Sequence, residues 1–309
     1  MSDTTDLTHT VSTDGPARGM TFSIRRRPDS PVAEGAPLVV ALPGGTYTSA
    51  YFDIPGQSLL DVAETVGVPV IAVDRPGYRG SSPVGTGEAG GSIILRNAEV
   101  LDHLIGELWE AYGAPTAGVV VIGHSIGGAV TTAIAARHPE WPLLGIAVSG
   151  CLVQVPAESG GAWAALPDLE FVELPGPVKD FVMYGPPWTH TAAMPAAGHA
   201  ADAPVPKAEL LDITGGWVER MPAVAGEVRV PVHSRMGEFD HLWIVDDAQV
   251  ALFKACFTGA PWVDARLVPN AGHCIDFHRA AKAFQLEQLA FALEAVLQAG
   301  RPADAPVPA

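Results

Sequence analysis

A serine between glycines is the feature of this sequence best suited to chemistry. The apolar run Val119–Ile122 leads into Gly123-His124-Ser125-Ile126-Gly127-Gly128, and the small-residue segment AVTTAIAAR follows. This pattern predicts a strand, a sharp turn and a helix, with glycines where the tight backbone leaves no room for side chains. Such a turn exposes the Ser125 hydroxyl at a helix N-terminus, where N–H groups and the helix dipole stabilise developing negative charge. The alternative is an ordinary glycine-rich turn between a strand and a helix.

The Gly-His-Ser-x-Gly-Gly form of this turn resembles the nucleophile elbow of the α/β-hydrolases, and the resemblance covers Thr21 to Gln298. It implies a serine nucleophile at Ser125, followed along the chain by an acid and then a histidine. A serine at this position argues against the haloalkane dehalogenases and epoxide hydrolases of the family, which place an aspartate there.

The acid is expected in the loop Gly237-Glu238-Phe239-Asp240, which looks like the family's Gly-x-x-Asp loop. Asp240 is the best candidate, because Glu238 would point away from the site. Asp246 and Asp247 fit better as the N-terminal cap of the next helix. The alternative for Asp240 is a solvated aspartate in a turn.

The base is expected at His273, because Val268-Pro269-Asn270-Ala271-Gly272-His273 resembles the closing loop of the family. His124 belongs to the elbow and would be fixed beside the nucleophile, so it is not the expected base. His103, His138, His241 and His278 have no motif around them. His190 and His199 lie in the stretch between the predicted strands, where they either touch substrate or are solvated, and we favour the latter.

The oxyanion loop of the family corresponds to Leu42-Pro43-Gly44-Gly45-Thr46. The resemblance implies one oxyanion donor at the N–H of Gly45 and the other at the N–H of Ile126, with Thr46 as a further possible donor. Pro43 stands where the family commonly has a histidine, so a side-chain bond that braces this loop is missing. If the loop is only a turn, one donor is lost, at a cost on the order of 100-fold in rate.

A further loop, Asp74 to Ser82, resembles the family's Asp-x-x-Gly-x-Gly-x-Ser loop with the second glycine displaced by one residue. We interpret it as structural. A phosphate-binding role is disfavoured because neither a P-loop nor a G-x-G-x-x-G motif accompanies its arginines.

Short apolar runs bounded by Gly or Pro predict the elements that carry these loops, since buried parallel strands have this pattern. The predicted strands are Leu38–Leu42, Val68–Val73, Gly118–Ile122, Leu143–Val148, Val228–His233 and Ala265–Val268. The predicted helices are Gln57–Val66, Leu95–Tyr112, Ile126–Arg137, Asp247–Phe257 and Ala280–Gln298. The alternation predicts an α/β fold with a mostly parallel central sheet flanked by helices, as in the α/β-hydrolase fold, with ligands at the carboxyl ends of the strands.

The stretch from Val155 to Ala225 breaks this alternation, because it has many prolines and aromatics and no clean buried strand. It is too long for an ordinary connection, so we predict an inserted cap subdomain. A disordered linker is the alternative, and the aromatic content weighs against it. In this cap, Trp163, Tyr184 and Trp188 are the expected substrate-binding residues, together with Thr46 of the oxyanion loop.

The predicted domain organisation follows from this reading. Residues 20–154 and 226–300 form the hydrolase core, and residues 155–225 form the cap. Residues 1–19 and 301–309 are polar or rich in Pro and Ala, so we expect mobile termini.

The amino-acid composition of the chain limits the kinds of molecule that it is expected to bind. The chain has 34 Asp and Glu against 18 Lys and Arg, for a net charge of −16, which disfavours nucleic acid and anionic membrane surfaces. Residues of hydrophobic type make up 48% of the chain, yet no apolar run approaches the ~18–20 residues of a membrane-spanning helix. The N-terminal segment lacks the pattern of a secretory signal. The sequence does not indicate an oligomeric state.

The cysteines and the other possible metal ligands give no sign of a metal site or a cofactor. Cys151, Cys256 and Cys274 are odd in number and lack CxxC spacing, so neither a disulfide framework nor a cysteine zinc site is predicted, and a reducing cytoplasm is the simplest compartment. No metal and no cofactor are expected, because no group of His, Asp, Glu and Cys has metal-ligand spacing.

The expected function is that of a serine hydrolase with a Ser125, His273 and Asp240 triad, which cleaves an ester, lactone, thioester or amide through an acyl-enzyme. The apolar character of the predicted cap favours a small, rather hydrophobic substrate. In this family the same triad also serves carbon–carbon bond hydrolysis, acyl transfer and cofactor-free lyase or cyclase chemistry. A ligand-binding module with little turnover is the alternative outside enzymes.

Overall fold

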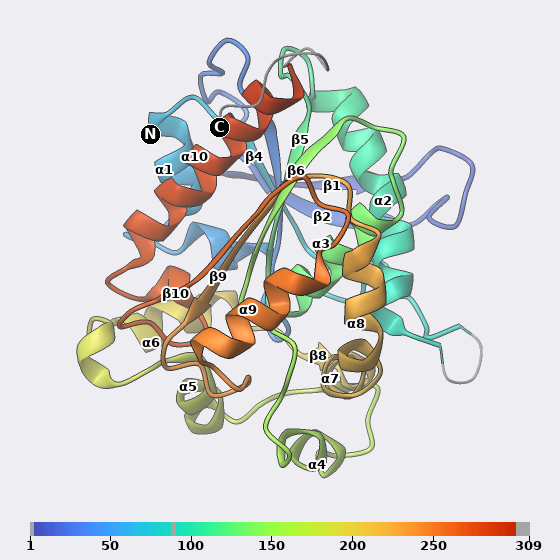
Figure 1. The fold of residues 1–309 in the computed structure, drawn as a ribbon. Coiled ribbons are helices and arrows are strands. Elements are labelled where there is room, and N and C mark those ends of the chain that lie inside the picture. Colours follow the sequence, from blue (N-terminus) through green and yellow to red (C-terminus); the bar gives the residue numbers. More distant parts are fainter. Residues whose placement is uncertain (1–2, 88–90, 301–309) are drawn as a thin grey trace.

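The computed structural model describes residues 3–87 and 91–300, and within these residues the centre of the molecule is one eight-stranded sheet (Figure 1). The strand order is β1-β2-β4-β3-β5-β6-β9-β10. β1 and β2 pair antiparallel with each other and β2 with β4, whereas the other neighbours are parallel. The strands are β1 (Thr5–Thr10), β2 (Thr21–Arg26), β3 (Leu38–Leu42), β4 (Val70–Val73), β5 (Val119–His124), β6 (Leu143–Ser149), β9 (Val232–Gly237) and β10 (Val263–Val268).

Helices cover both faces of the sheet (Figure 1). α1 (Leu59–Thr65) and α10 (Ala281–Ala299) lie on one face. The other face carries α2 (Ile93–Tyr112), α3 (Ile126–Ala136), α8 (Gly216–Gly226) and α9 (Asp247–Cys256). Along β3, alternate side chains pack into the two cores, which explains why the whole strand is apolar. The predicted fold class, a mostly parallel sheet flanked by helices, is confirmed.

One predicted strand is shifted along the chain. The apolar run suggested Val228–His233, but β9 is Val232–Gly237. Pro231 lacks an N–H and therefore cannot donate within a central ladder, so the regular strand begins after it. The polar residues Ser234 and Arg235 are buried inside the sheet. Because of the shift, β9 ends only three residues before Asp240, at the carboxyl edge of the sheet.

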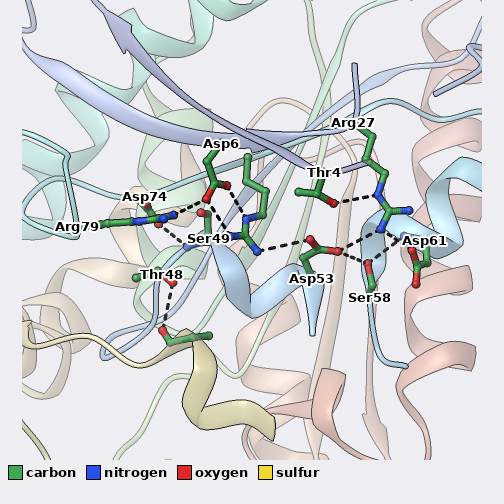
Figure 2. Close-up of polar contacts among 12 residues, drawn as sticks. Thr4, Asp6, Arg27, Thr48, Ser49, Asp53, Ser58, Asp61, Asp74 and Arg79 are labelled. Carbon is green, nitrogen blue, oxygen red and sulfur yellow. Dashed lines mark hydrogen bonds and ion pairs between the residues drawn. The ribbon is translucent and has the colours of Figure 1, made fainter. Parts of the chain in front are cut away.

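The N-terminal residues form an edge strand where the sequence analysis expects a mobile terminus. β1 pairs with β2 along its whole length, from Thr5 with Arg26 to Thr10 with Thr21. Its side chains are mostly exposed, so its sequence lacks the apolar pattern of a core strand. Asp6 accepts hydrogen bonds from Arg25 and Arg79, each at 2.9 Å, and Figure 2 shows Asp6 facing Arg79. Backbone pairing and these ion pairs hold β1. The other predicted mobile terminus, residues 301–309, lies outside the described residues.

The segment between β6 and β9 contains short helices and a small two-stranded sheet. Its helices include α4 (Ser159–Ala164), α5 (Gly176–Met183), α6 (Met194–Gly198), α7 (Lys207–Thr214) and α8, and its strands are β7 (Phe171–Val172) and β8 (Val205–Pro206). β7 and β8 pair antiparallel with each other and form a separate two-stranded sheet. α8 packs against α3 and α9, beside the main sheet. The assignment of residues 155–225 as a cap subdomain stays a prediction.

Candidate active site

Ser125 occupies a sharp turn between β5 and α3. Its backbone has φ 53° and ψ −122°, in the left-handed region that an L-residue adopts only under strain. A Cβ added at Gly123 would lie 2.3 Å from Thr131 Oγ1, and one at Gly127 would lie 2.2 Å from the Leu42 carbonyl oxygen. On both sides of Ser125, neighbouring atoms therefore come so close to the backbone that only glycine fits, as the sequence pattern predicted.

Asp240 and His273 lie side by side in the interior. His273 Nδ1 is 2.6 Å from Asp240 Oδ2, and both side chains are buried. The other carboxylate oxygen, Oδ1, accepts the backbone N–H of Leu242 at 2.8 Å. Because a carboxylate can only accept, the proton of the neutral imidazole sits on Nδ1. Nε2 of His273 is then the basic nitrogen, and it is buried with no hydrogen-bond partner among the described residues.

The other acidic candidates have structural partners. Asp246 is the N-cap of α9 and accepts the N–H of Gln249 at 2.7 Å, and Asp247 is the first residue of that helix. Glu238 accepts the N–H of Asn270 at 2.9 Å. These contacts agree with the choice of Asp240 as the partner of the histidine.

His124 is fixed beside this pair. Its ring stacks on Tyr51 at 4.8 Å between centroids and lies 4.8 Å from the ring of His273. Burial, and secondly the neighbouring His273, hold the pKa of His124 well below its ordinary value. A ring that is packed between two others and whose pKa is lowered is poorly placed to exchange protons.

His278 supports the loop that carries His273, a role that sequence reasoning missed. Its Nε2 accepts the N–H of Gly272 at 2.9 Å, and its Nδ1–H donates to the carbonyl of Cys274 at 2.7 Å. The two residues that flank His273 are thus tied to one ring. Burial lowers the pKa of His278 to about 4, so its Nε2 remains an acceptor near neutral pH. No motif surrounds His278, and only the folding of the loop back on itself reveals the contact.

The oxyanion loop lies against the start of α3. A Cβ added at Gly44 would come within 3.0 Å of Ser125 Cβ, and one at Gly45 would come within 2.8 Å of Ile126 Cδ1. Thr46 has a φ of 67° and a buried hydroxyl with no hydrogen-bond partner among the described residues. Gly45, Thr46, Ser125 and Ile126 all line one cavity. The loop after β4 supports this region, because Asp74 accepts the N–H of Ser49, as Figure 2 shows.

The remaining walls of this cavity are apolar. Leu242 and Trp243 come from the loop after β9, and the other apolar side chains come mainly from residues 155–225: Val155, Trp163, Leu174, Met183, Leu210 and Ile213. Trp163 and the candidate nucleophile therefore line the same cavity. The structure also brings Leu242, whose N–H holds Asp240, into the same wall.

Tyr184 and Trp188, the other two cap residues expected to bind substrate, are not among the described residues that line this cavity. Met183, at the end of α5, faces the cavity, and the following residue, Tyr184, points elsewhere and donates its hydroxyl to the carbonyl of Met194 at 3.3 Å. Trp188 is 65% exposed and packs edge-on against Phe239. Aromatic content locates the segment that lines the cavity but not the direction of each ring.

Metal ligands and membrane-spanning helices are the remaining features of the described residues that bear on function. Within residues 3–87 and 91–300, no group of three or more His, Cys, Asp or Glu side chains could hold a metal ion. Of the helices in the same ranges, none combines the length and the apolar character needed to cross a membrane.

A model of the alpha/beta hydrolase family matches residues 39–284, and the chain belongs to this family of enzymes. The resemblance stated from the nucleophile elbow is therefore confirmed. A sequence search found no match among curated proteins.

Solved structures share the fold at low sequence identity. The DbeA-M1 loop variant of a haloalkane dehalogenase from Bradyrhizobium elkanii is 16% identical, with a TM-score of 0.63 over 97% of this chain and 100% of that chain. An E-2-(acetamidomethylene)succinate hydrolase is 18% identical, with a TM-score of 0.62 over 95% of this chain and 99% of that one. The N-acyl homoserine lactonase AidH, complexed with N-hexanoyl homoserine lactone, is 18% identical, with a TM-score of 0.59 over 94% and 99% of the two chains.

Proposed function

We propose that this enzyme is a serine hydrolase that cleaves an ester, lactone, thioester or amide of a small, rather hydrophobic molecule. The observation that carries the proposal is that a candidate nucleophile and a buried pair of histidine and aspartate lie at the same edge of the sheet. Ser125 sits on a strained turn in a cavity, and a buried imidazole accepts no bond at Nε2 while Asp240 holds its Nδ1. These are the parts that acyl transfer to a serine requires.

In the proposed reaction, His273 Nε2 takes the proton of the Ser125 hydroxyl as its oxygen attacks the substrate carbonyl. Asp240 keeps the proton on Nδ1 and stabilises the imidazolium that forms. The N–H groups of Gly45 and Ile126 hold the oxyanion. His273 then gives its proton to the leaving group, and water, activated by the same histidine, releases the acyl group from Ser125.

The cavity walls favour an uncharged acyl or alcohol group. Its lining consists of aliphatic and aromatic side chains around a few hydroxyls, among them Thr46 and Thr214, and it contains no Asp, Glu, Lys or Arg among the described residues. A charged substrate group would lose its hydration here without a counter-ion. The lactonase of similar fold, whose structure holds an acylated lactone, supports a lactone as one substrate type to test.

The direct test is covalent labelling. A fluorophosphonate, which reacts with activated serines, should modify the protein once per chain, and peptide mass spectrometry should find the adduct on Ser125. An activated ester should give a burst of product equal to the enzyme concentration if deacylation is the slower step. An adduct on another serine, or no adduct together with no turnover of esters, lactones, thioesters or amides, would contradict the proposal.

Trp163 should set substrate preference. Replacing it with alanine removes part of the apolar wall and enlarges the cavity that Ser125 lines. The kcat/KM for esters with long acyl chains should therefore change by roughly 10-fold relative to acetate esters, because apolar pockets discriminate by about this factor between substrates that differ by a methylene group. Trp188→Ala is the matched control, because that ring is exposed outside the cavity. Its ratio of long-chain to acetate hydrolysis should stay within about 2-fold of the wild-type ratio. Equal ratios for Trp163→Ala and the wild type would show that this wall does not contact the acyl group.

A further inference from the structure

A buried arginine holds the backbone of the oxyanion loop. Arg75 Nε donates to the Pro43 carbonyl at 2.8 Å, and Arg75 Nη2 donates to the Gly44 carbonyl at 3.1 Å. The Arg75 side chain has no exposed surface. Two consecutive carbonyls of the loop therefore face one guanidinium, whose planar fork allows little change of geometry.

The direction of the Gly44 carbonyl determines the direction of the Gly45 N–H, because both belong to one peptide plane. In a planar trans peptide, the C=O and N–H bonds point to opposite sides. A Gly44 carbonyl that faces Arg75 therefore turns the Gly45 N–H away from Arg75. Gly45 lines the cavity together with Ser125, so the guanidinium lies behind the peptide whose N–H the proposed mechanism uses.

The counter-ion of Arg75 comes from a distant part of the chain. Glu209, in the first turn of α7, accepts from Nη1 and, at 3.0 Å, from Nη2 of Arg75, and it also accepts the Tyr78 hydroxyl at 2.7 Å. Glu209 is as completely buried as Arg75. Buried charges of this kind require a partner and saturated hydrogen bonds. The position of the guanidinium, and with it the loop, thus depends on a residue of the segment 155–225.

A second cation, which itself belongs to the segment 155–225, holds the end of the loop. Lys179 of α5 donates to the Thr46 carbonyl at 2.9 Å, pairs with Asp202 and lies 3.7 Å from the centre of the Tyr47 ring. The Thr46 carbonyl also accepts the N–H of Ala203 at 2.9 Å. Residues 155–225 therefore contact the loop at two places, each through a buried cation and a carboxylate.

We propose that Arg75 and Glu209 are a positioning pair that directs the Gly45 N–H at the oxyanion. The pair replaces the side-chain brace that Pro43 cannot provide. Through Glu209, the segment 155–225 then contributes to the rate of the chemical step and not to substrate choice alone. This inference rests on the proposed function, because an oxyanion forms only if Ser125 attacks a carbonyl.

The test is Arg75→Lys, assayed with p-nitrophenyl butyrate. Lysine keeps the charge opposite Glu209 but cannot donate to two carbonyls and a carboxylate with one planar group. We expect kcat per folded molecule to fall roughly 10- to 100-fold, with KM within about 3-fold of wild type, since losing one oxyanion donor costs about 100- to 1,000-fold in kcat. The affinity for a trifluoromethyl ketone, which forms a tetrahedral adduct, should fall by a similar factor.

A second variant separates loop position from an unpaired charge. The double replacement Arg75→Met with Glu209→Met removes both charges and fills both places with unbranched apolar side chains, a change that buried ion pairs often tolerate. It should fold and still lose kcat, because the two carbonyls lose their donor. Arg235→Lys is the matched control: Arg235 is also a buried arginine, paired with Asp264 of β10 and Glu287 of α10, and its replacement should lower thermal stability with kcat within about 3-fold of wild type.

The results for these variants would overturn the positioning role, or the proposed function, as follows. Folded Arg75→Lys and double variants with wild-type kcat and ketone affinity would overturn the positioning role. A loss of kcat in Arg235→Lys as large as in Arg75→Lys would also overturn it, because any buried arginine would then have the same effect. Ser125→Ala in the same assay tests the proposed function by itself. If Ser125→Ala abolishes turnover while Arg75→Lys does not change it, only the inference fails, whereas an active Ser125→Ala enzyme would overturn the proposed function.

Discussion

Replacement of Ser125 by alanine should lower kcat/KM for an activated ester by at least about 1,000-fold, because the hydroxyl that would carry the acyl group is then missing. The protein should remain folded. The Ser125 side chain makes no capping hydrogen bond to α3, so removing its hydroxyl takes away no contact on which the helix depends. Steady-state kinetics and urea unfolding of the same preparation measure the two effects separately.

Ser149→Ala is the control for this prediction. Ser149 is also buried, at the end of β6, and its hydroxyl lies 3.2 Å from His124 Nδ1, so the variant removes a hydroxyl close to the same site. Its activity should stay within about 10-fold of wild type, since one neutral hydrogen bond contributes about 1 kcal/mol. A Ser125→Ala variant that keeps more than a tenth of the wild-type activity would place the nucleophile elsewhere.

The elements that carry the site were predictable because their signals are local. Buried strands such as β3 and β5 are apolar at every position, since both of their faces are covered. The nucleophile turn needs glycines within a few residues of Ser125, and these can be read from the sequence. The order of serine, acid and histidine along the chain then limited the choice of Asp240 and His273, which the structure brings within 2.6 Å of each other.

The contacts that support these residues were not predictable, because they depend on how the chain folds in space and no motif marks them. Arg75 and Glu209 are 134 positions apart, and neither lies in a motif that names the other. His278 supports the His273 loop only because the chain turns back within a few residues. The pairing of Arg75 with Glu209 follows from the packing of the segment 155–225 on the core, which no local pattern encodes.

The directions of single side chains were equally hidden. Met183 and Tyr184 are neighbours at the end of α5, yet only Met183 lines the cavity. The edge strand β1 was also hidden from sequence analysis, because backbone pairing with β2 orders a segment whose side chains are mostly exposed. In both cases the deciding interaction is with a neighbour in space, and the composition of the segment does not predict that neighbour.

Replacement of Asp240 by asparagine should lower kcat by about 10,000-fold, and the structure gives the reason. Asp240 Oδ1 accepts the Leu242 N–H at 2.8 Å while Oδ2 accepts from His273 Nδ1 at 2.6 Å. An asparagine has only one oxygen, and the Leu242 N–H requires an acceptor. The amide NH₂ then faces Nδ1 and donates to it, which moves the imidazole proton to Nε2. The nitrogen that should accept the Ser125 proton is then already protonated.

Asp246→Asn is the matched control for this prediction, because it makes the same chemical change six residues further along. Asp246 caps α9, and asparagine is an equally good N-cap, so kcat should remain within about 2-fold of wild type and stability should change by less than about 1 kcal/mol. Fluorophosphonate labelling of Ser125 should slow in Asp240→Asn by a factor similar to the fall in kcat, since it needs the same base. If Asp240→Asn kept a kcat within 10-fold of wild type while Asp246→Asn lost activity, the acid of the triad would be on α9 and the tautomer argument would fail.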